Sequence, residues 1–125
     1  MKPRKTVLTE QELELMKIIW QRESVTVRDV YESLLEHRKI AYTTVMTMMG
    51  ILQEKGYVTK TNDAKAHVYQ PAQPKQLVVT HLVSDFVERV FNGSAKPLLL
   101  NLVENEKLSA KEIHEIAALL KKRAK

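Results

Sequence analysis

The hydrophobic pattern of this chain changes its period at Gly56, and that change limits the folds available to it. Within residues 42–55, apolar side chains recur at helical spacing. Those on one side of the expected helix are Val45, Met48, Met49 and Leu52. After Gly56, which suits the left-handed residue that ends a helix, residues 57–61 and 67–71 alternate and are rich in β-branched and aromatic types. The sequence therefore predicts a helix followed directly by a β-hairpin with a polar turn at residues 62–66.

Two capping boxes precede this unit and predict two more helices. Thr9 with Glu12 opens one helix that runs to about Arg22, and Thr26 with Asp29 opens another that runs to about His37. The apolar stripes of the two helices, which we expect in the core, are Leu13, Met16, Ile19, Trp20, Val27, Val30, Tyr31 and Leu34, with Leu35 as a further candidate. Three helices and a hairpin within about 70 residues is the order of a winged helix-turn-helix, in which the third helix enters the DNA major groove.

The outward side of the third helix supports this interpretation. Its residues are neutral, small or hydroxylated, whereas a helix face that only meets water usually carries Glu and Lys pairs. Hydroxyl and thioether side chains can contact phosphates, base edges and thymine methyl groups, and no carboxylate would repel the backbone. The predicted DNA-reading residues are Tyr42, Thr43, Thr44, Met46 and Thr47.

Charge is distributed unevenly along a chain whose net charge is +5. Residues 8–37 hold three basic and seven acidic residues, and residues 38–71 hold five basic and two acidic ones. Lys60 and Lys65 fall on the hairpin, and Arg4 and Lys5 lie near the start of the chain, so all four are predicted phosphate contacts. A solvated basic face is the alternative interpretation of the same charges.

From Pro74 onward the pattern is helical again, with segments at 75–91, around 98–103 and after the capping box Ser109 to Glu112. About 50 residues cannot bury all the apolar side chains of these helices internally, so we expect burial against a second copy. The predicted dimerisation residues are Leu82, Phe86, Val90, Leu99, Leu102, Val103, Ile113, Ile116 and Leu120. The expected division is a DNA-binding domain at residues 1–72 and a three-helix dimerisation domain at residues 73–125.

Other classes of protein are disfavoured. With no cysteine, the chain lacks thiolate metal sites and thiol nucleophiles, and no apolar run approaches the roughly 18 residues of a membrane span, so we expect a cytoplasmic protein. The best catalytic candidate, His81 with Asp85 plus His114 and Glu115, lacks a phosphate loop or nucleophile elbow. We therefore expect no catalytic residues, no metal and no cofactor.

Four stretches of the chain resemble the BlaI/MecI family of penicillinase repressors, over nearly its whole length. They are residues 8–16 with Ile19 and Trp20, residues 41–47, residues 52–58 and residues 98–103. The resemblance implies a homodimeric repressor of antibiotic-resistance genes that binds inverted repeats with TACA/TGTA-like half-sites. Ile51 departs from the Arg that many relatives carry, which removes one expected phosphate contact.

The resemblance also implies a switch. In antibiotic-responsive members, a BlaR/MecR-type membrane sensor system leads to cleavage of the repressor at an Asn-Phe bond. The matching bond here is Asn101–Leu102, where Leu102 departs from Phe and can instead be a residue of the dimer core. A winged helix used only for protein interaction is the alternative function, because a fold does not determine its use.

Overall fold

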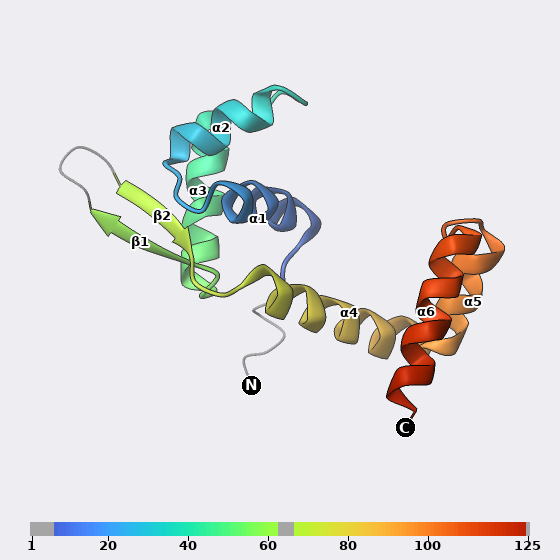
Figure 1. The fold of residues 1–125 in the computed structure, drawn as a ribbon. Coiled ribbons are helices and arrows are strands. Elements are labelled where there is room, and N and C mark those ends of the chain that lie inside the picture. Colours follow the sequence, from blue (N-terminus) through green and yellow to red (C-terminus); the bar gives the residue numbers. More distant parts are fainter. Residues whose placement is uncertain (1–6, 63–66, 125) are drawn as a thin grey trace. The chain divides into compact units, whose positions relative to one another are not determined.

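A computed structural model describes residues 7–62 and 67–124 of the chain. These residues form six helices and one antiparallel hairpin (Figure 1), in the order α1 (Glu10–Arg22), α2 (Val27–Leu35), α3 (Tyr42–Glu54), β1 (Val58–Asn62), β2 (His67–Pro71), α4 (Lys75–Phe91), α5 (Lys96–Glu104) and α6 (Ala110–Arg123). The chain divides into two compact units within α4, between Leu82 and Val83. The predicted boundary at residue 72 separates a DNA-binding domain from a dimerisation domain. It divides the chain by function and stays a prediction.

The helices begin where their capping residues predict. Thr9 Oγ1 accepts a hydrogen bond of 3.1 Å from the Glu12 amide, and the Thr9 amide donates one of 2.9 Å to Glu12 Oε1. The same reciprocal pair opens α2 and α6. The predicted end of the second helix at His37 is wrong by two residues, because the amides of Glu36 and His37 bond three residues back and form a turn.

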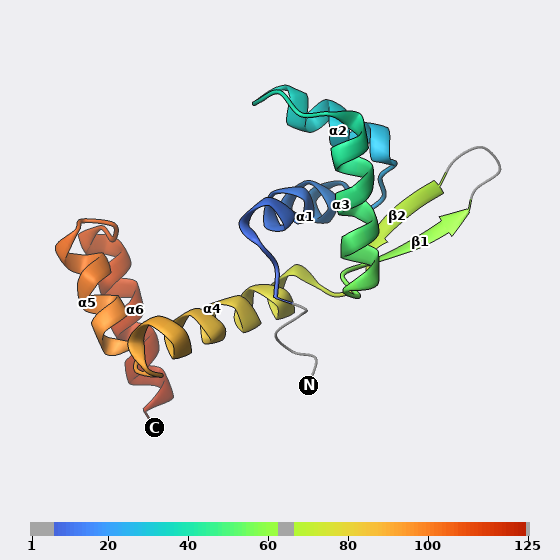
Figure 2. The same ribbon diagram turned by 180° about the vertical axis from the view of Figure 1, so that it is seen from behind.

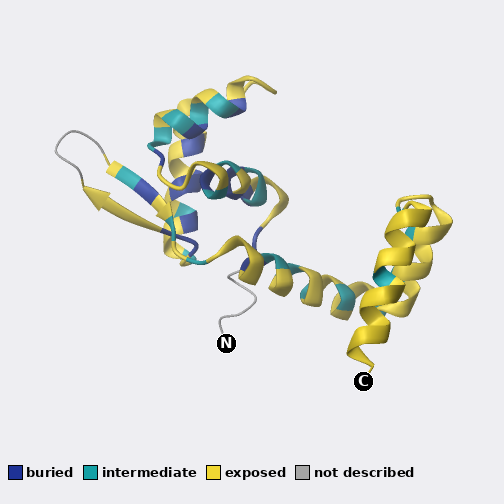
Figure 3. Ribbon diagram, viewed as in Figure 1, coloured by how far each residue is buried: buried dark blue, intermediate teal, exposed yellow. Residues whose placement is uncertain are grey.

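The first unit surrounds a core to which α1, α2, α3 and the hairpin all contribute, drawn in dark blue in Figure 3. An isolated bridge between Val25 and Tyr69 ties the α1–α2 connection to β2 through bonds of 2.7 and 3.0 Å. Most predicted core positions are confirmed, but Leu13, Trp20, Val27 and Tyr31 are only partly buried and Leu35 is 44% exposed. The fully buried side chains are Leu15, Met16, Ile19, Val25, Val30, Leu34, Val45, Met49 and Leu52.

The second unit is built differently. Figures 1 and 2 both draw α5 and α6 side by side, joined by a short connection. None of its described residues, 83–124, is classed as buried, so this unit has no interior of its own comparable with the first. Among all the described residues, no helix combines the length and apolar character that a membrane span requires.

Candidate nucleic-acid interface

Helix α3 has two contrasting sides. Val45, Met48, Met49 and Leu52 are buried in the core, as the sequence predicts. The five predicted DNA-reading residues all lie on the exposed side: Tyr42, Thr43, Thr44, Met46 and Thr47. A helix anchored on one side with an uncharged outer face can bring hydroxyl and thioether groups to the base edges of a groove.

The start of α3 is also distinctive. Its N-cap residue, Ala41, makes no side-chain hydrogen bond, and the first turn holds no acidic residue. By contrast, α1, α2 and α6 each begin with a capping box that places a carboxylate on the first amides. The amides and the positive end of the dipole of α3 are therefore not offset by its own side chains, which favours a nearby anion such as a phosphate.

Tyr42 is held in place from α2. Its ring packs edge-on against that of Tyr31 with the centroids 5.2 Å apart, and the Arg28 guanidinium lies 5.9 Å from the Tyr42 centroid. Arg28 thus brings positive charge beside the predicted interface. Sequence analysis did not single out Arg28, because helical spacing places it away from the apolar stripe of the second helix.

The hairpin lies next to α3 and pairs Val58 with Pro71 through Asn62 with His67. Lys60 is exposed on β1, opposite the buried Tyr69 on β2. At the outer end of the described ladder, His67 Nδ1 lies 2.6 Å from Asn62 Oδ1, so the ring nitrogen donates to the amide oxygen. The other predicted phosphate contacts, Lys65, Arg4 and Lys5, lie outside the described residues.

Two of the basic residues counted in the 38–71 stretch are engaged within the first unit. Arg38 Nη2 donates to Glu14 Oε1 over 2.8 Å, and Lys55 Nζ donates to Glu12 Oε1 over 2.8 Å and to the Val7 carbonyl over 3.1 Å. The charge reversal along the sequence therefore overstates the positive charge available to a polyanion. Lys39 and Lys60 stay exposed and form no ion pair with another described residue.

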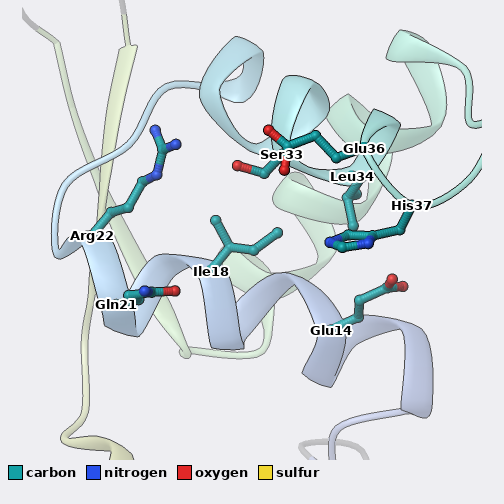
Figure 4. Close-up of a pocket in the computed structure, with 8 residues that line it drawn as sticks. All are labelled: Glu14, Ile18, Gln21, Arg22, Ser33, Leu34, Glu36 and His37. Atoms are coloured by element: carbon teal, nitrogen blue, oxygen red, sulfur yellow. The ribbon is translucent and has the colours of Figure 1, made fainter.

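A separate polar groove of about 590 Å³ lies between α1 and the end of α2. Figure 4 shows Ile18 and Leu34 at its centre, with Arg22 toward one end and Glu14 and His37 toward the other. None of its lining residues comes from α3 or the hairpin. This groove is therefore not part of the candidate interface.

The second unit contains most of the predicted dimerisation residues. Phe86, Val90, Leu99, Val103, Ile113 and Leu120 are exposed, while Leu102 and Ile116 are partly buried. Leu82, at the end of the first unit, is also partly buried. The Asn101–Leu102 bond lies inside α5, and Asn105 Nδ2 donates to the Asn101 carbonyl over 2.9 Å.

The rejected catalytic candidates are ordinary surface groups. Asp85 Oδ2 accepts a bond of 2.8 Å from Arg89 Nε on the same helix, so its carboxylate already has a cationic partner. His81, His114 and Glu115 are exposed. Within residues 7–62 and 67–124, no three His, Asp or Glu side chains gather closely enough to hold a metal ion.

Comparison with known proteins agrees with these observations. A family profile described as penicillinase repressor matches residues 8–122. The penicillinase repressor of Bacillus licheniformis is 29% identical over 113 residues, covering 90% of this chain and 88% of that protein. The transcriptional regulator BlaI of Mycobacterium tuberculosis is 37% identical over 101 residues, covering 79% of this chain and 73% of that protein.

Solved structures give the same fold for the first unit. The solution structure of the DNA-binding domain of the repressor BlaI matches with a TM-score of 0.50 and 28% identity, covering 54% of this chain and 83% of that domain. The predicted fold class, mainly α with a small hairpin wing, is confirmed.

Proposed function

The chain belongs to the penicillinase repressor family, and from this premise we propose that it represses transcription as a homodimer bound to inverted-repeat operator DNA. Of the relatives that match over most of its length, one is named a penicillinase repressor and another a transcriptional regulator. Half-sites of the TACA/TGTA type, as the family resemblance implies, are the expected targets.

The exposed, uncharged face of α3 is the observation that carries this proposal. Tyr42, Thr43, Thr44, Met46 and Thr47 share that face, and the helix begins without a cap or an acidic residue. Such a helix can approach phosphates closely while its hydroxyl and methyl groups discriminate bases. These five residues are accordingly proposed to read sequence.

Basic residues around this face are proposed to supply attraction that does not depend on sequence. Lys60 on the wing is exposed, and Lys65, Arg4 and Lys5 add further charge. Each phosphate contact releases condensed counterions, so binding weakens as salt rises. Salt dependence therefore distinguishes this group of residues from the α3 face.

The homodimer is supported by the apolar side chains that the second unit leaves uncovered, including Phe86, Val90 and Leu99. A two-fold pair of chains presents two α3 helices to half-sites about one helical turn apart. Release by cleavage at Asn101–Leu102, downstream of a membrane sensor, stays a prediction of the resemblance. That bond is helical, so a protease would first have to unwind α5 locally.

Fluorescence anisotropy tests the proposal. A duplex with a TACA/TGTA inverted repeat is titrated with the full chain beside a scrambled duplex of equal length, at two salt concentrations. Preference for the repeat, with affinity that falls as salt rises, is the expected result. Equal affinity for both duplexes, or no binding, would favour the protein-interaction alternative.

A further inference from the structure

A cavity of about 470 Å³ lies in the first unit, where the N-terminus of α2, the first turns of α3 and strand β2 meet. Its size falls in the range of sites that hold small molecules. Its lining includes Val27, Arg28, Tyr42, Met46, His67 and Tyr69. No residue of its described lining carries a carboxylate.

Tyr69 is the feature that points to a ligand. The residue is only 6% exposed, yet its hydroxyl makes no hydrogen bond to another described residue. The oxygen is not sealed away from solvent, because the described residues include no fully buried polar atom that lacks a partner. Burial and the neighbouring Tyr42 raise the pKa of Tyr69, so its hydroxyl stays protonated at neutral pH and can donate.

The charges around the cavity favour an anion. The Arg28 guanidinium lies beside the Tyr42 ring, and its contact with Glu32 is long, at 3.4 Å, and exposed. The first amides of α2 are engaged by the capping box of Thr26 and Asp29, so the positive charge at the cavity comes from Arg28. Asp29, the other carboxylate on α2, accepts from the Thr26 amide over 2.9 Å and lies 4.0 Å from Arg22.

The remaining walls are apolar. Val27, Met46 and the ring of Tyr42 offer aliphatic, thioether and aromatic surfaces. Flat rings pack well on such surfaces, edge-to-face or offset. A phosphate of the DNA backbone would leave this apolar surface uncovered. An aromatic acid would contact the apolar surface with its ring and Arg28 with its carboxylate.

We propose that this cavity binds a small aromatic carboxylate, with its ring against Tyr42 and Met46 and its carboxylate held by Arg28 and the Tyr69 hydroxyl. Tyr42 and Met46 also belong to the face proposed to read DNA, so a bound ligand and an operator compete for them. That consequence, unlike the binding itself, rests on the proposed function. The cavity is then an effector site whose occupancy releases DNA.

Titration calorimetry of the full chain without DNA tests the site, with 2-naphthoate as the probe and 2-naphthamide as its uncharged counterpart. The amide should bind about tenfold more weakly, because a charge-assisted bond is lost. Tyr69→Phe should weaken naphthoate several-fold without lowering stability, since the hydroxyl has no hydrogen-bond partner to lose among the described residues. Arg28→Met should weaken it more, and Ser33→Ala, in the separate groove, should have no effect.

The binding proposal is overturned if naphthoate fails to bind at millimolar concentration, if the amide binds equally well, or if neither cavity variant changes the affinity. Operator titrations with and without naphthoate test the competition. A higher apparent Kd for the operator in its presence supports the effector role, and an unchanged Kd overturns that role alone. If the chain shows no preference for the operator over a scrambled duplex in the absence of naphthoate, the proposed function is wrong. The calorimetry without DNA still tests whether the cavity binds naphthoate.

Discussion

The two units of this chain solve the burial of apolar side chains in opposite ways. The first unit encloses nine of its described apolar side chains almost completely, whereas the described residues of 83–124 include no buried side chain. Similar apolar content thus leads to a self-sufficient core in one unit and to an uncovered surface in the other. A unit of the first kind can fold alone, and a unit of the second kind is completed by association.

This difference matches a division of tasks. A DNA-reading helix needs a rigid support, and α3 has one because its inner side is locked into the core. The second unit can leave apolar residues uncovered because another copy covers them in the proposed dimer. Substitutions in each unit should therefore act differently: on the unfolding of the first unit and on the association of the second.

The largest effect is expected from charge on the uncovered surface. Phe86→Asp combined with Val90→Asp should separate the dimer and lower operator affinity by about 10²–10⁴-fold, because the second half-site contact ceases to be intramolecular. Sedimentation velocity and anisotropy measure the two consequences, with Ser84→Ala on the same helix as the control. A double variant that still sediments as two chains would remove this surface from the interface.

In the core of the first unit, Leu15→Ala should lower the free energy of unfolding by about 2–5 kcal/mol, since Leu15 is fully buried. Urea unfolding followed by Trp20 fluorescence should show a midpoint shift that is the same at every protein concentration. The matched change Leu120→Ala, at a residue that is 59% exposed, should act only through the concentration-dependent dimer. A concentration-dependent effect of Leu15→Ala would contradict the self-sufficient core.

The ion pair between Lys55 and Glu12 should matter more than its surface counterparts. Lys55→Met leaves the Glu12 carboxylate, whose side chain is 8% exposed, without its cation and should cost about 1–3 kcal/mol in urea unfolding. Glu32→Gln breaks the exposed pair with Arg28 and should cost less than about 0.5 kcal/mol. An equal loss of unfolding free energy in the two variants would show that burial does not set the strength of these ion pairs.

Within the proposed interface, contacts to bases and contacts to phosphates should respond differently to substitution. Thr47→Ala should relax discrimination at one base position by about 1–3 kcal/mol, while Lys60→Ala should weaken all duplexes alike and reduce the salt slope by about one. Anisotropy with single-base operator variants at several salt concentrations separates the two. If both variants behaved alike, the division between base and phosphate contacts would be wrong.

Much of this architecture was predictable because its signals are local. Capping boxes at Thr9, Thr26 and Ser109 placed three helix starts, and the change of period at Gly56 placed the hairpin. The exposed face of α3 followed from helical spacing alone.

What could not be predicted depends on contacts between distant segments. The pairing of Lys55 with Glu12 and of Arg38 with Glu14 joins residues more than twenty positions apart, so a charge count along the chain missed both. The cavity around Tyr69 likewise needs α2, α3 and β2 to be brought together. Leu15 and Glu12 are buried outside the expected stripe because both α2 and the hairpin cover α1.

The mass of the complex with operator DNA, measured by sedimentation or light scattering, tests the central claim most directly. The full chain is mixed with a duplex carrying the TACA/TGTA inverted repeat and with a scrambled duplex. Two chains are expected on each specific duplex, and none on the scrambled duplex at the same concentration. A single chain on the repeat, or equal occupancy of both duplexes, would contradict it.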